Sequence, residues 1–327
     1  MSRRTYNARR LLGFALARAF FGGLPRRASY TIMAVVGWVV ATIFPSRVAG
    51  LRQNLEHVLP TATPAQITDL MQRNAKNYGK FWVDLFKMPR LSREYKNSLA
   101  TVDGWENLEA VMERGQGCIC VTIHMGGWEG CTSLWGTRSP WRTGLIAEVL
   151  EPPALWRQIL KLRESSGLTV IPLGRTAPRE ILRRLKNNEM VVGAIDRDLL
   201  GSGRSFPFFG GTISVPTGLI EVAQRTGAGI LPVTCYRLPD DNYKFVGMKP
   251  HWVGPGAGAV EATTQAILAE FEGYIRRFPD QWHVMVPIFD QADATLAAPT
   301  PRPAAAPDPA PARVAVMSSR EAEESVG

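Results

Sequence analysis

Short apolar runs alternate with stretches of helical periodicity along most of the chain. Runs rich in β-branched residues and bounded by Gly or Pro predict buried strands, at residues 118–123, 142–148, 168–173, 190–195, 229–236 and 243–248. Apolar residues at helical spacing predict helices, at residues 51–86, 106–114, 153–165, 178–187, 216–225 and 260–278. This alternation predicts an α/β fold with a largely parallel central sheet flanked by helices.

The first fifty residues have a different pattern. Residues 9–21 mix Leu, Phe and Ala with Arg9, Arg10 and Arg18, which is typical of an interfacial amphipathic helix. Residues 28–44 are 17 uncharged positions, the short limit for crossing a bilayer. We therefore expect residues 1–50 to form membrane-associating helices that act as a monotopic anchor. One shallow span, or a helix packed on the protein's own core, are the alternatives.

Charge supports this interpretation. Residues 1–55 contain nine Lys or Arg and no Asp or Glu, so they hold the whole formal net charge of +9. A basic arm of this kind binds either an anionic membrane or a nucleic acid. Because its aromatic side chains belong to apolar runs, we expect anionic membrane lipids as partners and no nucleic acid.

The remaining chain divides into two parts. Residues 51–290 form the predicted globular domain, and residues 291–327 form a Pro- and Ala-rich segment that predicts a disordered tail. Neither the cysteines nor the scattered histidines have the spacing of a metal site, so we expect no metal and reduced, packed thiols. These residues are Cys118, Cys120, Cys131, Cys235, His57, His251 and His283.

The strongest candidate for chemistry is His124. The strand at 118–123 delivers it at a carboxyl end, where open α/β sheets place their ligand clefts. Gly126 and Gly127 allow a tight turn, and Glu129 follows in the next turn of chain, within reach of the imidazole. A histidine oriented by a carboxylate is a general base for a hydroxyl or an amine.

The motif His124-Met-Gly-Gly-Trp-Glu129 resembles the His-x4-Glu/Asp motif of the lysophospholipid and glycolipid acyltransferase superfamily. It is most similar to the branch of lipid A late acyltransferases and phosphatidylinositol mannoside acyltransferases, in which Asn usually stands where this chain has Gly127. Further pieces resemble the family in the same order over residues 10–290. They are Arg52–Leu55, Leu59-Pro60, Val102–Glu106, Asp196–Asp198, Phe208–Gly210, Pro216–Gly218, Thr226–Ala228 and Leu231-Pro232.

This resemblance implies O-acyl transfer at the cytoplasmic face of the plasma (inner) membrane. The donor would be acyl-CoA or acyl carrier protein as co-substrate, with no further cofactor. The acceptor would be a lysophospholipid, a phosphatidylinositol mannoside or a lipid A precursor. His124 would be the base, oriented by Glu129 together with Asp196, which matches a second acidic position in the mannoside acyltransferases. A membrane-surface binding protein on the same fold, without turnover, is the alternative.

Other candidates would bind substrate at the same sheet edge. Arg175 and Arg197 follow predicted strands, and with Arg204 they are candidates to bind a phosphate or the phosphopantetheine arm. Asp198 would hold Arg197 or Arg175. The backbone amides of Gly126 and Gly127 are the expected oxyanion donors. The aromatic cluster at residues 206–210 fits either a mobile lid or a turn packed on the core.

Overall fold

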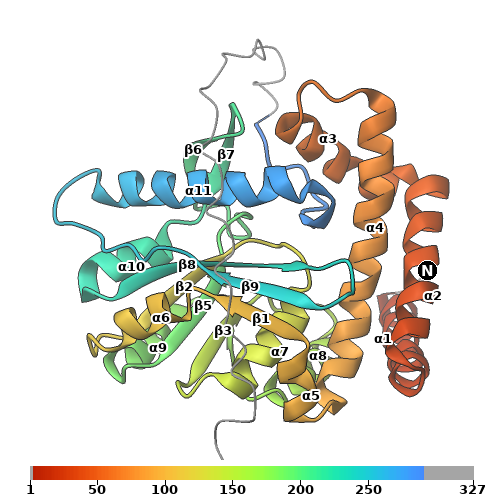
Figure 1. Ribbon diagram of the computed structural model, residues 1–327, viewed down its shortest axis with the longest axis horizontal. Helices are drawn as coiled ribbons and strands as arrows, with labels where there is room; N and C mark the ends of the chain where they lie inside the picture. Colours follow the sequence, from red (N-terminus) through yellow and green to blue (C-terminus); the bar gives the residue numbers. More distant parts are fainter. Residues whose placement is uncertain (1–2, 291–327) are drawn as a thin grey trace, which may run out of the picture.

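A seven-stranded sheet forms the centre of the computed structural model, which describes residues 3–290 (Figure 1). Its strand order is β1-β9-β8-β2-β5-β3-β4, and every neighbouring pair is parallel except β8 with β9. The strands are β1 (Ala100–Asp103), β2 (Cys118–Thr122), β3 (Thr143–Ala147), β4 (Thr169–Pro172), β5 (Met190–Ala194), β8 (Gly229–Arg237) and β9 (Tyr243–Gly247). The predicted α/β fold with a largely parallel sheet is confirmed.

Helices cover both faces of this sheet because its central strands are apolar on both sides. Ile119 and Val121 of β2 pack against one set of helices, whereas Cys118 and Cys120 pack against the other. The first set is α9 (Ala177–Lys186), α10 (Gly218–Thr226) and α11 (Ala259–Arg277), and the second includes α6 (Trp105–Met112) and α7 (Trp128–Arg138). Alternate residues of one strand thus supply two cores, as expected of a sheet buried on both faces.

Residues 204–215 were predicted as neither a strand nor a helix from their hydrophobic pattern. They form a separate antiparallel hairpin of β6 (Arg204–Phe208) and β7 (Gly211–Val215). Phe206, Phe208 and Phe209 are buried in the larger core. Of the two interpretations of this aromatic cluster, the packed turn is therefore correct. The sequence also gave no indication of the short strand β1.

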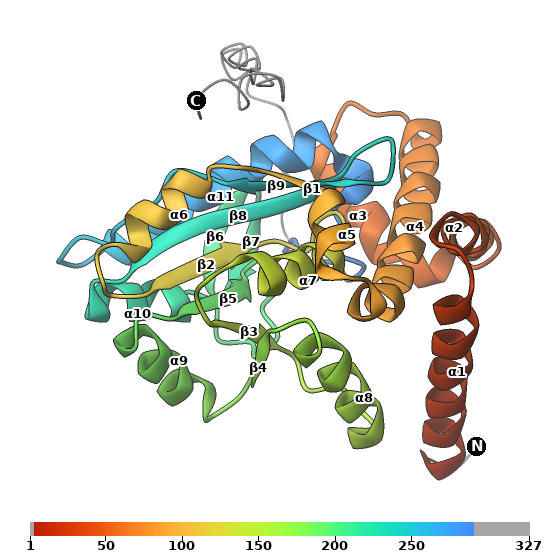
Figure 2. The ribbon, with the colours of Figure 1, turned by 60° about the horizontal axis from the view of Figure 1, so that its bottom comes forward.

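The N-terminal segment consists of α1 (Arg3–Gly23) and α2 (Arg26–Ile43), followed by α3 (Ala49–Val58). Helix α2 runs along α4 (Pro64–Lys87), as Figure 1 shows. The two backbones approach closely, because a Cβ atom at Gly37 would lie 2.2 Å from the carbonyl oxygen of Ala75. Figure 2 shows α1 projecting along the edge of the molecule beside α8 (Pro153–Glu164).

One face of these N-terminal helices is open to solvent. Leu12, Leu16 and Phe20 of α1 are more than half exposed, and Val35 and Trp38 of α2 are 56% and 41% exposed. No single helix within residues 3–290 is long and apolar enough to cross a bilayer. The bent pair formed by residues 26–43 and 45–58, which turns through 104°, passes a test of length and composition. The predicted tail at residues 291–327 lies outside the described residues.

Candidate active site

The candidate catalytic pair lies where β2 and β5 end. These strands are parallel neighbours, and Thr122 is aligned with Ala194 in their register. His124 and Asp196 each follow two residues later, so the register alone brings them to the same point of the sheet edge. His124 Nδ1 lies 2.7 Å from Asp196 Oδ1, and the His124 backbone N–H donates to Asp196 Oδ2 at 2.8 Å.

Asp196 is a fully buried carboxylate that stays ionised. Burial alone would raise its pKa, but the charge of His124 and hydrogen bonds from His124 and the Trp282 indole hold the pKa below its usual range. An ionised Asp196 accepts the Nδ1–H of His124 and so fixes the tautomer of the ring. The Nε2 atom then carries the lone pair that a general base needs.

Residues 281–283 form hydrogen bonds with this pair and with Gly126. The Gly126 N–H donates to the Gln281 carbonyl at 2.7 Å, the His283 N–H donates to the His124 carbonyl at 2.8 Å, and the Trp282 indole N–H donates to Asp196 at 3.0 Å. Residues 281–283, which follow α11, therefore complete the site from far along the chain.

His283 itself is a residue of the site to which the sequence analysis gave no chemical role. Its side chain is buried and contributes to the cavity in front of His124. Its Nδ1 lies 2.9 Å from Asn74 Oδ1, and the Asn74 amide donates to the Trp282 carbonyl, so the Nδ1 atom of His283 is the donor. Burial, with the charges of Arg237 and His124, lowers the pKa of His283 to about 3, so this ring is neutral.

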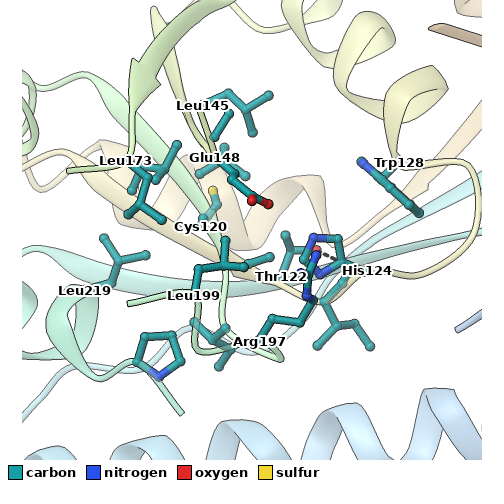
Figure 3. Close-up of a pocket in the computed structure, with 18 of the residues that line it drawn as sticks. Cys120, Thr122, His124, Trp128, Leu145, Glu148, Leu173, Arg197, Leu199 and Leu219 are labelled. Carbon is teal, nitrogen blue, oxygen red and sulfur yellow. Dashed lines mark hydrogen bonds between the residues drawn. The ribbon is translucent and has the colours of Figure 1, made fainter. Parts of the chain in front are cut away.

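His124 opens onto a deep and mainly apolar cavity of about 680 Å³ (Figure 3). Aliphatic side chains from several elements line it, among them Leu145, Leu173, Leu199 and Leu219. The cavity extends between two strands, because the pairing of β3 with β5 stops at Leu145 and Val192 while the residues beyond both still line it. A cavity of this size and polarity fits a small or elongated apolar ligand.

Glu129 does not lie where the sequence analysis placed it. Its carboxylate is buried in the first turn of α7 and accepts from Arg163 of α8, through Nε at 3.0 Å and through a second guanidinium nitrogen. The turn at residues 126–127 directs α7 so that this side chain meets α8. The expected contact between Glu129 and the His124 ring is therefore wrong, and Asp196 alone of the two acids holds that ring.

The glycines of the turn also have a different role from the expected one. Gly126 has a φ of +62°, and its N–H is already bonded to Gln281. A Cβ atom at Gly126 would lie 2.4 Å from the Cys235 carbonyl, and one at Gly127 would lie 2.5 Å from the Tyr243 ring. Neither glycine lines the cavity. They allow close packing on β8 and β9, and the Gly126 amide is not an oxyanion donor in this arrangement.

Comparison with known proteins identifies the family of this chain. Residues 5–291 match the family of bacterial lipid A biosynthesis acyltransferases. The chain belongs to this family. Among curated relatives, the phosphatidylinositol mannoside acyltransferase of Mycobacterium tuberculosis is 32% identical over 246 residues, which cover 72% of this chain and 75% of the relative. That of Mycolicibacterium smegmatis is 30% identical over 241 residues, which cover 72% of this chain and 78% of the relative.

The family and these relatives support an acyltransferase that acts on lipids. Within this acyltransferase, Tyr243 explains one departure from the branch it resembles. The Tyr243 ring occupies the space beside Gly127, so the Asn usual at that position would not fit without a shift. The His124–Asp196 pair does not depend on that side chain.

The four charged residues expected to bind substrate are not gathered at one point. Arg197 lines the cavity near His124, and its buried Nε has no hydrogen-bond partner among the described residues (Figure 3). Arg175 is exposed beyond the end of β4. Arg204 lies outside the cavity lining and pairs with Glu221 and Glu261.

Asp198, expected to hold an arginine, instead shapes the loop before β6. Its carboxylate accepts the backbone N–H groups of residues 200–203 and the Ser214 hydroxyl. Although burial opposes ionisation, the hydrogen bonds from Gly203, Ser214 and the neighbouring amides hold the pKa of Asp198 below its usual range. Asp198 thus contributes to the cavity wall by fixing a loop.

The cysteines are all buried and form no disulfide. Burial and a neighbouring thiol raise the pKa of Cys131 well above its usual value, which disfavours the reactive thiolate. Cys120 and Cys131 line the cavity as small apolar groups. Their environment therefore favours packing over nucleophilic chemistry.

Proposed function

We propose that this protein transfers a fatty acyl group from acyl-CoA or acyl carrier protein to a hydroxyl of a membrane glycolipid of the phosphatidylinositol mannoside class. The observation that carries the proposal is the His124–Asp196 pair at the opening of a deep apolar cavity. Similarity to two phosphatidylinositol mannoside acyltransferases favours this acceptor over a lysophospholipid or a lipid A precursor.

In the proposed reaction, His124 Nε2 takes the proton of the acceptor hydroxyl as its oxygen attacks the thioester carbonyl. Asp196 stabilises the imidazolium that forms and holds it by Nδ1. The tetrahedral intermediate then collapses, the carbon–sulfur bond breaks, and the imidazolium returns its proton to the leaving thiolate. The products are an O-acyl ester and a free thiol, and His124 is again neutral.

Arg197 supplies positive charge for this reaction. Its guanidinium lies at the cavity near His124, and its Nε–H has no acceptor among the described residues. Preorganised donors aimed at a developing oxyanion are often the largest single contribution to acyl transfer. We assign this role to Arg197 in place of the Gly126 amide, which Gln281 already occupies.

The apolar cavity accommodates the acyl chain of the donor. A Cβ atom at Gly193 of β5 would lie 2.7 Å from a methyl carbon of Leu219, so the glycine lets Leu219 pack directly against β5 in the cavity wall. We further propose that the protein works at the plasma (inner) membrane, on its cytoplasmic face, and the exposed apolar face of α1 and α2 supports this association with a lipid surface.

The proposal is tested with the purified full-length protein and detergent-dispersed acceptors. Phosphatidylinositol mannosides, a lysophospholipid and a lipid A precursor are each incubated with acyl-CoA or acyl carrier protein thioester, and products are measured by mass spectrometry. We expect one added acyl chain on the mannoside. Acylation of another acceptor alone would overturn the assigned lipid class, and no acylation with either donor would overturn the enzymatic proposal.

The role of Arg197 has its own test. Arg197→Gln should lower kcat by about 10²-fold while the KM for the donor changes little, because an oxyanion donor acts in the transition state. The conservative variant Arg197→Lys should recover part of this loss. A rise in the acceptor KM with unchanged kcat would instead assign Arg197 to binding of the lipid phosphate.

A further inference from the structure

A second cavity lies on the opposite side of α4 from the candidate active site, and nothing in the proposed reaction uses it. This headgroup groove, of about 910 Å³, is bounded by α2, by α4, by α5 (Arg93–Ser98) and by the turn between β8 and β9. Its lining includes the basic Arg27 and Lys76, the apolar Val35 and Trp38, and the acidic Asp240 and Asp241.

Four basic side chains line the groove against two acidic ones. Asp241 pairs with Lys80, whereas Asp240 accepts from Asn242, which is neutral and leaves the charge of Asp240 in place, so the lining has a surplus of two positive charges. Arg27 and Lys76 are exposed, and no ion pair is recorded for either among residues 3–290. The groove therefore offers two uncompensated cations to an anionic ligand.

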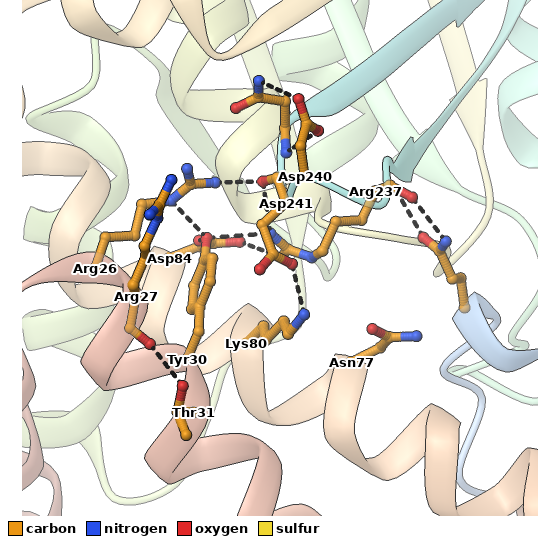
Figure 4. A network of polar contacts seen from close by, with 12 residues as sticks. Arg26, Arg27, Tyr30, Thr31, Asn77, Lys80, Asp84, Arg237, Asp240 and Asp241 are labelled. Carbon is orange, nitrogen blue, oxygen red and sulfur yellow. Dashed lines mark hydrogen bonds and ion pairs between the residues drawn. The ribbon is translucent and has the colours of Figure 1, made fainter.

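The wall behind these cations is fixed by a buried network. Asp84 accepts from Arg237 at 2.7 Å and from the Tyr30 hydroxyl, while Arg26 Nε donates to the same hydroxyl at 2.9 Å (Figure 4). Burial, followed by the charge of Asp84, raises the pKa of Tyr30 well above its usual value, so the phenol stays protonated. Asp84 is thus neutralised inside the protein and leaves the charge of Arg27 unopposed.

The groove also has an apolar edge on the membrane-facing helix. Val35 and Trp38 line it and are 56% and 41% exposed, and the neighbouring Ile32 and Val36 of α2 are 36% and 43% exposed. A basic pocket bordered by exposed apolar side chains fits an amphiphile that has a phosphate at one end and hydrocarbon at the other. A free phosphate ion would leave the apolar edge in water.

We propose that the headgroup groove binds the phosphate of an anionic phospholipid, with Arg27 and Lys76 on the phosphate and the acyl chains along Val35 and Trp38. The lipid is a structural ligand that seats the enzyme on the membrane and is distinct from the acceptor at His124. This inference rests on the membrane association proposed above. It adds a defined site to what would otherwise be diffuse attraction between a basic arm and anionic lipid.

The test compares two charge-matched double variants of the full-length protein by vesicle co-sedimentation. One neutralises the groove, Arg27→Gln with Lys76→Gln, and the control neutralises two exposed lysines outside it, Lys186→Gln with Lys249→Gln. On vesicles of phosphatidylcholine with phosphatidylglycerol, the groove variant should bind about 30-fold more weakly than the native chain, the effect of two lost basic residues at an anionic surface. The control variant should change binding by less than about threefold, because its two lysines lie outside the groove.

Several outcomes would overturn the proposal that this groove binds an anionic phospholipid. Equal losses in the two double variants would show diffuse attraction, and equal binding to pure phosphatidylcholine vesicles would show that the net negative charge of the headgroup is not recognised. Competition by inorganic phosphate at the same concentration as a soluble short-chain phosphatidylglycerol would assign the site to the free ion. His124→Ala keeps the groove intact, so it should bind vesicles as the native chain does. Vesicle binding therefore tests the groove even if the proposed acyl transfer fails.

Discussion

Two buried carboxylates lie close to the His124 turn, and they belong to different regions of the molecule. Asp196 stands at the end of β5, faces the cavity edge of the sheet and accepts three hydrogen bonds from His124 and Trp282. Glu129 stands in α7, faces α8 and pairs with Arg163. Both are almost inaccessible to solvent, so burial does not distinguish them. Their partners do.

The difference shows how parallel register governs this site. Asp196 is 72 residues from His124 along the chain and touches it, because adjacent strands end at the same level. Glu129 is five residues from His124 and does not, because the intervening turn carries it away. We infer that the acid of the motif joins two helices next to the cavity, whereas the acid of the neighbouring strand serves the base.

The first prediction removes the proposed general base, His124, with which both carboxylates are compared. His124→Ala should lower acyl transfer by roughly 10²- to 10⁴-fold, since a positioned general base contributes about that factor. Circular dichroism and thermal unfolding should be close to native because the side chain is partly exposed at the cavity. Turnover close to native, with the same product by mass spectrometry, would contradict the proposed mechanism.

The second prediction addresses Asp196. In Asp196→Asn the amide oxygen should stay at the Oδ2 position, where the His124 N–H and the Trp282 indole N–H both donate. The amide NH2 group would then face Nδ1 and force the ring proton onto Nε2, the wrong tautomer for a base. We expect kcat to fall by roughly 10²- to 10³-fold with little change in KM. A variant as active as the native enzyme would return the orienting role to another group.

The third prediction is the counterpart for Glu129. Glu129→Gln should lower turnover by less than about tenfold, because the side chain orients a helix and takes no proton. The free energy of unfolding should fall by about 2 kcal/mol, since a buried hydrogen bond to a charged group is weakened. Asp69→Asn, which weakens the exposed pair with Arg73, is the matched control and should change stability little. A loss of turnover as large as that of Asp196→Asn would place Glu129 in the catalytic machinery.

Most of the fold could be predicted from the hydrophobic pattern, because apolar runs indicate buried strands and apolar residues at helical spacing indicate helices. The exceptions are informative. Strand β1 has alternate exposed residues and only four positions, and β6 contains Pro207, so neither carries a strong strand pattern. The site was predictable as far as strand ends go, since both His124 and Asp196 follow apolar runs. The strand order could not be predicted from the sequence, and only that order shows that β2 and β5 are neighbours.

Residues that complete the site from a distance were also beyond sequence pattern. His283 and Trp282 follow the last helix, and their contacts with His124 and Asp196 span more than 80 residues. No local periodicity encodes such a contact. The one available signal was the polar and aromatic content of residues 281–283, which is unspecific on its own.

The last prediction concerns His283, which belongs to the segment at residues 281–283 and not to the catalytic pair. Its folded pKa of about 3 lies below the ordinary value of 6.5, so the unfolded chain binds more protons between these values. Stability should therefore fall as pH decreases from about 6.5 towards 3, and unfolding should become easier at each step. His283→Gln keeps an amide donor for Asn74 but cannot titrate, so its unfolding temperature should depend less on pH across that window. Thermal unfolding of the two proteins at pH 7, 6, 5 and 4 measures this difference. Parallel curves would show that His283 is protonated in the folded protein, and its assigned role as a neutral donor to Asn74 would then be wrong.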